Sequence, residues 1–339
     1  MVTLGDNSFY MKLALDAAWK YQGLTYPNPA VGCCLVGSHG EILSVQAHQK
    51  AGFAHAEVLA LQSAYYKLTG DAFILDLSVS SDIHDYLIAH HKGIFRQCSL
   101  YTTLEPCSHI GKTPSCATLV SKLAISKVYV GSEDFNPKAS KGNALLSASG
   151  VQVECGVLKD ECDALLEPFK KFQTKNFVFF KWAQRLNGTL DKGIITSKSS
   201  RKLVHQMRGV CDLMVVGGET VREDRPRLDA RLANAKAPDV FIYSREKEFD
   251  QTIPLFHVQE RKVIISDNFD ALSGYKNIMI EGGSQMYKLT RDITDIYLVF
   301  IAPKFGGKTG MQEIEDEFEI LNLYQETQDI IMWTKRLNK

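Results

Sequence analysis

The chain has little of what marks membrane-embedded, secreted or general nucleic-acid-binding proteins. Its 39 basic residues equal its 39 acidic residues, so no excess of charge favours a polyanion. No apolar stretch approaches the roughly 20 residues that a membrane-spanning helix needs. The first residues lack the basic start, apolar run and cleavage site of a secretory signal. We therefore expect a cytoplasmic protein, with neither nucleic acid nor membrane as partner.

Cysteine is present but scattered, with 8 residues in a chain of 339. Without a secretory signal a disulfide framework is not expected, and most of these cysteines are predicted to be small, buried apolar residues. Cys33 and Cys34, in the apolar run AVGCCLVG, fit that role. Cys107 and Cys116 differ, because polar turn residues surround them, and they are candidates for chemistry.

The alternation of apolar patterns predicts two α/β domains, and the chain is longer than one core usually organises. In the first half, strand-like and helical runs follow a β–α–β–α–β order, which is typical of a three-layer α/β domain. A second alternating set begins at NFVFFKWAQ. We place the domains at 1–172 and 176–339, with no Pro/Gly/Ser-rich linker between them.

The N-terminal segment predicts a helix that packs into the core. Its start carries polar residues suited to accept free backbone N–H groups, namely Asp6, Asn7 or Ser8. Apolar residues recur with helical spacing after that point. The predicted core face consists of Phe9, Leu13, Ala17 and Tyr21.

A stretch at 67–97 interrupts the first domain. It contains His84, His90 and His91, and a cluster of histidines can bind metal. No cysteine stands at ligand spacing from them, so the preferred interpretation is a solvated helical face. The sequence does not indicate what this insertion does.

The strongest signal for chemistry is a pair of short motifs. H-A-E begins at His55, E-P-C ends at Cys107, and Cys116 follows nine residues later. One imidazole and two thiolates leave the fourth position of a tetrahedral zinc for water, whose pKa the metal lowers to about 7. A carboxylate that does not bind the metal must then move protons, and Glu57 is placed for it. We predict a zinc-dependent hydrolytic deaminase, although the usual spacing is P-C-x-x-C and two cysteines flanking a loop are the alternative.

The runs YPNPAVG, AHQKAGFAHAEVLAL and TLEPCSHIGKTPSC resemble the bifunctional riboflavin biosynthesis family RibD, and the resemblance covers nearly the whole chain. It implies a cytidine-deaminase-like domain acting on 2,5-diamino-6-(5-phosphoribosylamino)pyrimidin-4(3H)-one, a small molecule. It also implies a dihydrofolate-reductase-like domain that uses NADPH, and a homo-oligomer, dimer or larger. The deaminase substrate residues that it implies are Asn28, His48, His109 and Lys112.

The second half has a weaker signal of its own. Two strands end at Gly-Gly pairs, which could cradle phosphate or form ordinary turns. The resemblance implies substrate contacts, including a phosphate site, from Lys181, Arg208, Asp224, Arg231 and Glu281. It implies cofactor contacts from Gln184, Thr220, Asp224, Ser244, Gly282, Gly283 and Ser284.

One segment departs from the family pattern. After the first strand of the second domain the chain reads AQRLNG where the family has A-S-L-D-G, and the stretch between Gly188 and Ile195 is short. An active deaminase with a degenerate reductase domain is therefore one alternative. A zinc deaminase acting on nucleic acid is another, and a zinc-stabilised module without activity is a third. We expect an active reductase, because Lys181, Asp224, Arg231 and the E-G-G turn are kept.

Overall fold

The computed structural model describes residues 6–109, 111, 113–135, 141–191, 193–311 and 314–337. The chain divides into two compact units, Met1–Lys170 and Lys171–Lys339. Each unit has its own sheet, of five strands in the first and eight in the second as far as the described residues go. No helix in these ranges is long and apolar enough to cross a membrane.

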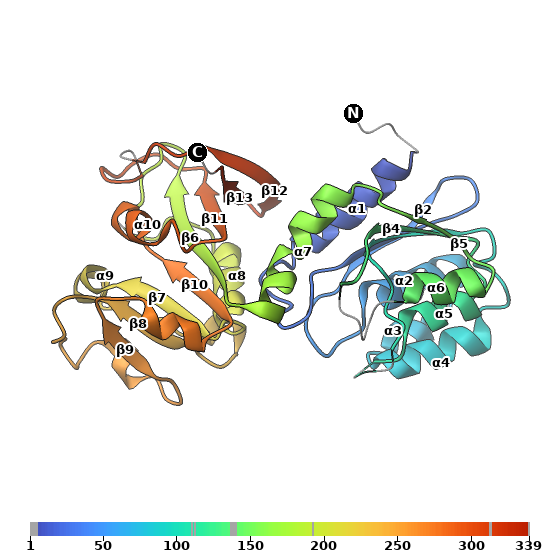
Figure 1. Cartoon of the computed structure of the whole chain (residues 1–339), viewed down its shortest axis with the longest axis horizontal. Helices are drawn as coiled ribbons and strands as arrows, with labels where there is room; N and C mark the ends of the chain where they lie inside the picture. Colours follow the sequence, from blue (N-terminus) through green and yellow to red (C-terminus); the bar gives the residue numbers. More distant parts are fainter. Residues whose placement is uncertain are drawn as a thin grey trace. The chain divides into compact units, whose positions relative to one another are not determined.

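The first unit is a sheet between two layers of helices. Figure 1 shows α1 and α7 on one side of the sheet, with α2, α5 and α6 on the other, so the predicted three-layer arrangement is confirmed. The strand order is β2-β1-β3-β4-β5; β1 is antiparallel to β2 and β3, while β3, β4 and β5 are parallel. The elements are α1 (Asn7–Trp19), β1 (Gly32–Val36), β2 (Ile42–Ala47), α2 (Ala56–Thr69), α3 (Phe73–Asp76), α4 (Ser80–His90), β3 (Ser99–Leu104), α5 (Cys116–Lys122), β4 (Lys127–Ser132), α6 (Gly142–Ala148), β5 (Gln152–Cys155) and α7 (Lys159–Thr174).

Helix α1 begins where the sequence predicts, but it buries a different face. Asp6 caps it, and its carboxylate accepts the backbone N–H of Phe9 at 2.8 Å. The predicted core face was wrong: its four residues are only half-buried, because the helix packs on β1 through the face that carries Ala14. A Cβ on Gly32 would lie 1.8 Å from the carbonyl oxygen of Ala14, so the helix and β1 touch backbone to backbone. The buried residues of α1 are Tyr10, Met11, Ala14, Leu15, Ala18 and Trp19.

The insertion at 67–97 forms the end of α2, the short α3, and α4. Its histidines do not share one solvated face, so that prediction was wrong for one of them. His84 is only 3 % exposed, because it follows Ile83 and precedes Leu87 on the face of α4 that turns inward. His90 is exposed, and its ring stacks on Tyr86 with centroids 4.1 Å apart.

The second unit is built on one mixed sheet. Its order is β12-β13-β11-β6-β10-β7-β8-β9, parallel from β11 to β9, with β13 and β12 added antiparallel at one edge. The sequence pattern predicts most of these strands but misses β12. The elements are β6 (Phe177–Arg185), α8 (Lys198–Arg208), β7 (Leu213–Gly217), α9 (Gly218–Asp224), β8 (Asp239–Tyr243), β9 (Val263–Ser266), β10 (Asn277–Glu281), α10 (Ser284–Thr290), β11 (Ile296–Ala302), β12 (Phe318–Glu326) and β13 (Asp329–Arg336), with 3-10 turns at Arg231–Ala233, Pro254–His257 and Asp270–Gly274.

The close approach of α1 to β1 predicts a cost for any side chain at Gly32. We expect Gly32→Ala to destabilise the first unit by about 1–3 kcal/mol, because the backbone of Ala14 cannot move as a flexible side chain would. Calorimetry of the purified chain measures the loss. Gly274→Ala is the control, since a Cβ there would meet nothing within 4 Å; equal unfolding temperatures for the two variants would contradict the prediction.

Candidate active sites

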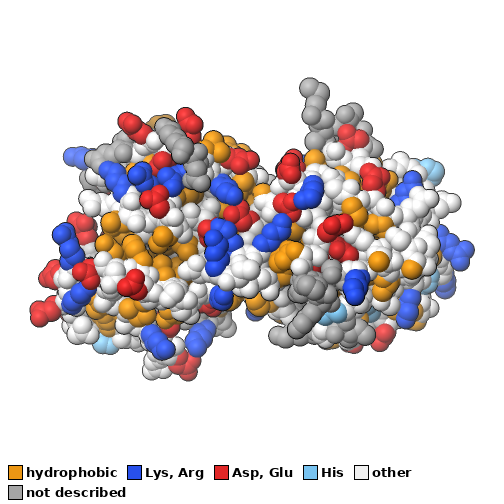
Figure 2. Space-filling view, in the orientation of Figure 1, with side chains coloured by type: hydrophobic (Ala, Val, Ile, Leu, Met, Phe, Trp, Pro, Cys, Tyr) orange, Lys and Arg blue, Asp and Glu red, His pale blue; other side chains and the backbone are white. Residues whose placement is uncertain are grey.

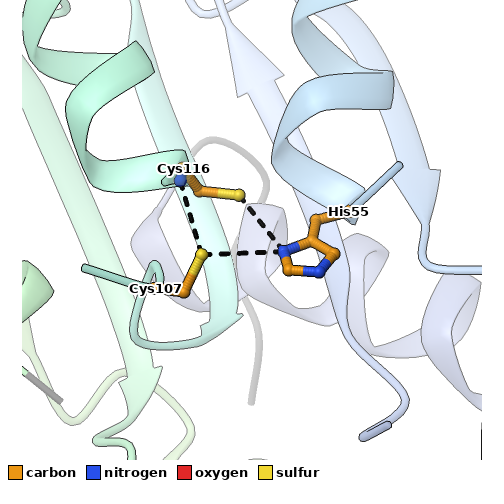
Figure 3. A group of neighbouring side chains, drawn as sticks. All are labelled: His55, Cys107 and Cys116. Carbon is orange, nitrogen blue, oxygen red and sulfur yellow. Dashed lines mark hydrogen bonds between the residues drawn. The ribbon is translucent and has the colours of Figure 1, made fainter. Parts of the chain in front are cut away.

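Three predicted metal ligands converge in the first unit. His55 is the residue that caps α2, Cys107 follows the end of β3, and Cys116 is the first residue of α5. Figure 3 shows the two thiols and the imidazole pointing toward one another from these three elements. Their ligand atoms all lie within 4.8 Å of one another, close enough to share a metal. Among the described residues, no other group of three or more histidine, cysteine or carboxylate side chains meets this criterion.

The spacing of the ligand atoms fits zinc. Nδ1 of His55 lies 3.7 Å from Sγ of Cys107 and 3.4 Å from Sγ of Cys116. Zinc bonds of about 2.3 Å to sulfur and about 2.0 Å to nitrogen, at tetrahedral angles, place such atoms about 3.6 Å apart. Thr113 Oγ1 lies 3.4 Å from Nε2 of His55, which leaves Nδ1 as the metal-facing nitrogen. Two sulfurs and one nitrogen are also the donor set that zinc prefers.

The two thiols have pKa values shifted in opposite directions. Hydrogen bonds from Cys116 and His55 lower the pKa of the Cys107 thiol to about 4, against the effect of burial. The same hydrogen bond to Cys107, together with burial, raises the pKa of Cys116. A divalent cation between them would remove this inequality, because a thiol that coordinates a metal is deprotonated outright.

Glu57 lies in the first turn of α2 and is 3 % exposed. Burial raises the pKa of this carboxyl to about 7, and the carboxylate accepts a hydrogen bond from the thiol of Cys116. It is therefore next to the metal ligands without being one of the three clustered donors. A carboxyl that titrates near neutral pH can both accept and release a proton.

Two of the predicted substrate residues sit beside this group. The ring of His48 packs edge-on against that of His55, with centroids 5.4 Å apart, and it is 2 % exposed. Burial lowers the pKa of His48 to about 4, so the imidazole is neutral. Its Nε2 lies 3.2 Å from Nδ2 of Asn28, and its Nδ1 lies 3.1 Å from the carbonyl oxygen of Ala54. The structure thus brings Asn28 and His48 together with the metal ligands.

The other two predicted substrate residues are placed differently. His109 lies in the connector between the two cysteines, with an exposed side chain. Lys112 lies outside the described residues. The sequence prediction for these two positions therefore remains a prediction.

Several residues that hold the cysteines in place were not predicted. Ser115 caps α5 and donates its hydroxyl to the carbonyl of Cys107 at 2.9 Å. Glu105 accepts the backbone N–H groups of Asp134 and Asn143 at 3.0 and 2.9 Å. The signal for Glu105 was its place in the E-P-C motif. These contacts fix the connector on either side of the metal ligands.

In the second unit, a charged cluster joins the middle of β6 to the end of β10. Lys181 and Glu281 are register partners on these parallel strands, with Nζ and Oε2 3.9 Å apart. Arg208 binds both carboxylate oxygens of Glu281 at 3.0 Å. Burial would raise the pKa of Glu281, but the charges of Arg208 and Lys181 lower it; burial lowers the pKa of Lys181. Three of the predicted substrate residues therefore form one largely buried group, with side chains 13–17% exposed.

A second carboxylate, which was not predicted from the sequence, continues this cluster. Asp229 is buried and pairs with Arg231 at 2.5 Å and Arg227 at 2.8 Å. Its carbonyl oxygen accepts from Arg208 at 3.4 Å, and its carboxylate lies 3.9 Å from Nδ1 of His205. The signal was the alternation of charges in RPRLDAR. Arg231 thus reaches the buried group through Asp229.

The second unit also has a cleft of about 610 Å³. Its walls come from the ends of β7 and β8, from α9, and from Gly283 and the residues of α10 that follow it. Gln184 and Gly282 do not line it; the amide oxygen of Gln184 accepts from the indole N–H of Trp182 at 2.7 Å. The predicted cofactor residues that do line it are Thr220, Asp224, Ser244, Gly283 and Ser284.

The segment that departs from the family pattern still contributes to this cleft. Leu190 and Asp191 line it, next to Thr309 and Gly310. The Asp191 carboxylate accepts the backbone N–H groups of Lys308 and Thr309 at 2.9 and 3.2 Å. The altered residues are therefore tied to the loop after β11 and form a wall of the cleft.

Comparisons with known proteins agree on both halves. The family described as "Cytidine and deoxycytidylate deaminase zinc-binding region" matches residues 5–132, and "RibD C-terminal domain" matches 177–331. The chain is 32% identical to a riboflavin biosynthesis protein RibD of Aquifex aeolicus, over 96% of this chain and 98% of the relative. It is 37% identical to a RibD of Actinobacillus pleuropneumoniae, over 93% and 90%.

Solved structures agree as well. The crystal structure of a diaminohydroxyphosphoribosylaminopyrimidine deaminase/5-amino-6-(5-phosphoribosylamino)uracil reductase from Thermotoga maritima aligns with a TM-score of 0.63 and 26% identity, over 98% of this chain and 99% of that one. The fold and the metal ligands define a zinc-dependent deaminase domain joined to a dihydrofolate-reductase-like domain. With the similarity extending over both halves, the chain belongs to the RibD family of riboflavin biosynthesis proteins.

The converging ligands predict stoichiometric zinc. We expect about one zinc per wild-type chain, and loss of most of it in Cys107→Ser and Cys116→Ser, because a hydroxyl is a much poorer zinc ligand than a thiolate. Metal analysis by plasma mass spectrometry measures this directly. The control is Cys155→Ser, which replaces an exposed cysteine outside the group; zinc retained in all three variants would refute the assignment.

Proposed function

We propose that the chain catalyses two consecutive steps of riboflavin biosynthesis. The first unit hydrolyses an exocyclic amine of 2,5-diamino-6-(5-phosphoribosylamino)pyrimidin-4(3H)-one and releases ammonia. The second unit reduces the ribosyl group of the product to ribityl with NADPH, giving 5-amino-6-(5-phosphoribitylamino)uracil. The observation that carries the proposal is the buried Glu57 beside three zinc-type ligands, in a chain whose second half belongs to the RibD reductase type.

In the deaminase, His55, Cys107 and Cys116 would hold the metal and Glu57 would move protons. Bound zinc supplies a water whose pKa is lowered to about 7. Glu57 takes a proton from the attacking water and delivers protons to the ring nitrogen and the leaving amine. The water oxygen becomes the new carbonyl, and the amine departs as ammonia. Asn28, His48, His109 and Lys112 are proposed to surround the substrate, as the family resemblance implies.

In the reductase, the cleft lined by Thr220, Asp224 and Ser244 is proposed to hold NADPH, with Gln184 and the turn at 282–284 nearby. The bound cofactor supplies the hydride. Lys181, Arg208 and Arg231 are proposed to bind the phosphoribosyl end of the substrate, because guanidinium and ammonium groups pair with phosphate. Glu281 holds Arg208 and Lys181 in position, and Asp224 is proposed to contact both substrate and cofactor.

An active reductase is favoured over a degenerate one. The segment that departs from the family lines the cleft rather than closing it, since the cleft keeps about 610 Å³. The ion pairs of Glu281 with Lys181 and Arg208 are also both present in the part of the chain that the structure describes. On the face shown in Figure 2, basic and acidic side chains are interspersed, which gives no support to a nucleic-acid substrate.

Three further points are proposals of the same kind. We assign residues 1–172 to the deaminase and 176–339 to the reductase, with the small-molecule intermediate as the shared ligand. A cytoplasmic location suits two free thiols that serve as metal ligands. A homo-oligomer, dimer or larger, is the expected assembly.

Proton transfer by Glu57 predicts a specific failure. We expect Glu57→Gln to keep its zinc but release ammonia at least about 10²-fold more slowly, because an amide of the same shape cannot shuttle protons. Coupled ammonia detection with the purified substrate measures the rate. NADPH oxidation with pre-deaminated substrate should stay at the wild-type rate; ammonia release at the wild-type rate would remove Glu57 from the mechanism.

The two arginines that pair with Asp229 offer a matched test of the phosphate site. Their side chains are similarly exposed, 58% for Arg231 and 56% for Arg227. We expect Arg231→Gln to raise the KM of the reductase substrate by about tenfold or more, as for loss of one charged hydrogen bond. Arg227→Gln should change it little. Steady-state NADPH oxidation measures both, and equal effects would contradict the assignment.

A further inference from the structure

A short chain of hydrogen bonds runs through the deaminase site from Ala54 to Asn28. Nδ1 of the His48 ring lies 3.1 Å from the carbonyl oxygen of Ala54. Nε2 of the same ring lies 3.2 Å from the amide nitrogen of Asn28. Both nitrogens of His48 therefore have partners within the protein, and the ring is 2 % exposed.

The first contact fixes the tautomer of His48. A carbonyl oxygen can only accept a hydrogen bond, so Nδ1 must carry the proton that it donates to Ala54. The other nitrogen, Nε2, faces the amide nitrogen of Asn28 at 3.2 Å, and an amide nitrogen can only donate. Nε2 is consequently an acceptor.

The second contact then fixes the side-chain amide of Asn28. Only its NH₂ group can face an acceptor, because the flipped amide would set an oxygen lone pair against the lone pair of Nε2. Oδ1 of Asn28 is left pointing away from His48, and it has no hydrogen-bond partner among the residues described. Pro27 and Pro29 restrict the backbone on either side, so the side chain starts from a constrained position.

We propose that His48 is a positioning residue, which acts on the substrate through Asn28 rather than by direct contact. The amide of Asn28, oriented in this way, presents an oxygen acceptor on the side away from His48, whose ring packs against the metal ligand His55. The group that Oδ1 recognises is an N–H donor of the pyrimidine, either a ring N–H or an amine. This inference rests on the proposed deaminase function and names one determinant of its specificity.

The proposal predicts that His48 and Asn28 act as one unit. We expect His48→Phe, which keeps a ring but has no acceptor, and Asn28→Ala each to lower kcat/KM for ammonia release by about 10- to 100-fold, mainly through KM. The double variant should lose no more than about twofold beyond Asn28→Ala, because coupled residues are not additive. His48→Gln should recover most of the activity, since its amide can accept from Asn28 and donate to Ala54. If the losses of kcat/KM in the two single variants instead multiply in the double variant, His48 contacts the substrate independently of Asn28, and the proposal is overturned.

Controls separate this role from a structural one. Zinc content should stay at the wild-type level in His48→Phe, whereas a residue that only supports His55 would lose metal on substitution. His90→Gln, in the exposed part of α4, should match the wild type in both zinc and kinetics. Loss of zinc in His48→Phe together with loss of activity in His48→Gln would overturn the positioning role.

The tautomer can be read without any turnover. Nuclear magnetic resonance of the zinc-loaded chain with ¹⁵N-labelled histidine should show the His48 proton on Nδ1, with the signal assigned by its absence from His48→Gln. A proton on Nε2 would reverse the predicted orientation of Asn28 and overturn the inference. Absence of ammonia release by the wild type would instead defeat the proposed function, while the tautomer still decides the orientation of Asn28.

Discussion

The deaminase half depends on the meeting of two helix starts. His55 precedes the first residue of α2, Cys116 is the first residue of α5, and their ligand atoms lie 3.4 Å apart. Cys107 joins them because its carbonyl oxygen accepts the hydroxyl of Ser115 and the backbone N–H of Ala117. The core residues of α2 and α5 belong to one hydrophobic cluster. Movement of either helix would separate the donors, so packing of the core and geometry of the metal site are one constraint.

Much of this site could be predicted because it is local in sequence. H-A-E places a ligand and a carboxylate within one turn, and E-P-C places a ligand directly after a strand. The tautomer of His48 could not be predicted, because it depends on the carbonyl of Ala54, which has no sequence signature. Asp229 was missed for a similar reason: its partners His205 and Arg208 come from a helix about twenty residues earlier in the chain.

Helix faces were the least predictable feature of the fold. In α1, more than one stripe of apolar residues could have faced the core. The buried stripe is the one that packs on Gly32, which lies on β1 and therefore cannot be read from the helix sequence. For α4, His84 was predicted to lie on a solvated face because no cysteine stands at ligand spacing from it, yet the helix turns it inward with Ile83 and Leu87. In both helices the residue types allow more than one buried face, and the surface against which the helix packs determines which face is buried. The strand order of the second sheet, in which β6 lies between β11 and β10, was likewise set by non-local pairing.

The charged cluster of the second unit is unbalanced in sign. Lys181, Arg208 and Arg231 supply three cations, against the two carboxylates of Glu281 and Asp229, and Arg227 adds a fourth cation at the edge. This excess of positive charge favours an anionic ligand, as proposed above for the phosphate of the substrate. Inorganic phosphate in a buffer would compete for the same charges, and the fit between cluster and substrate would weaken as ionic strength rises.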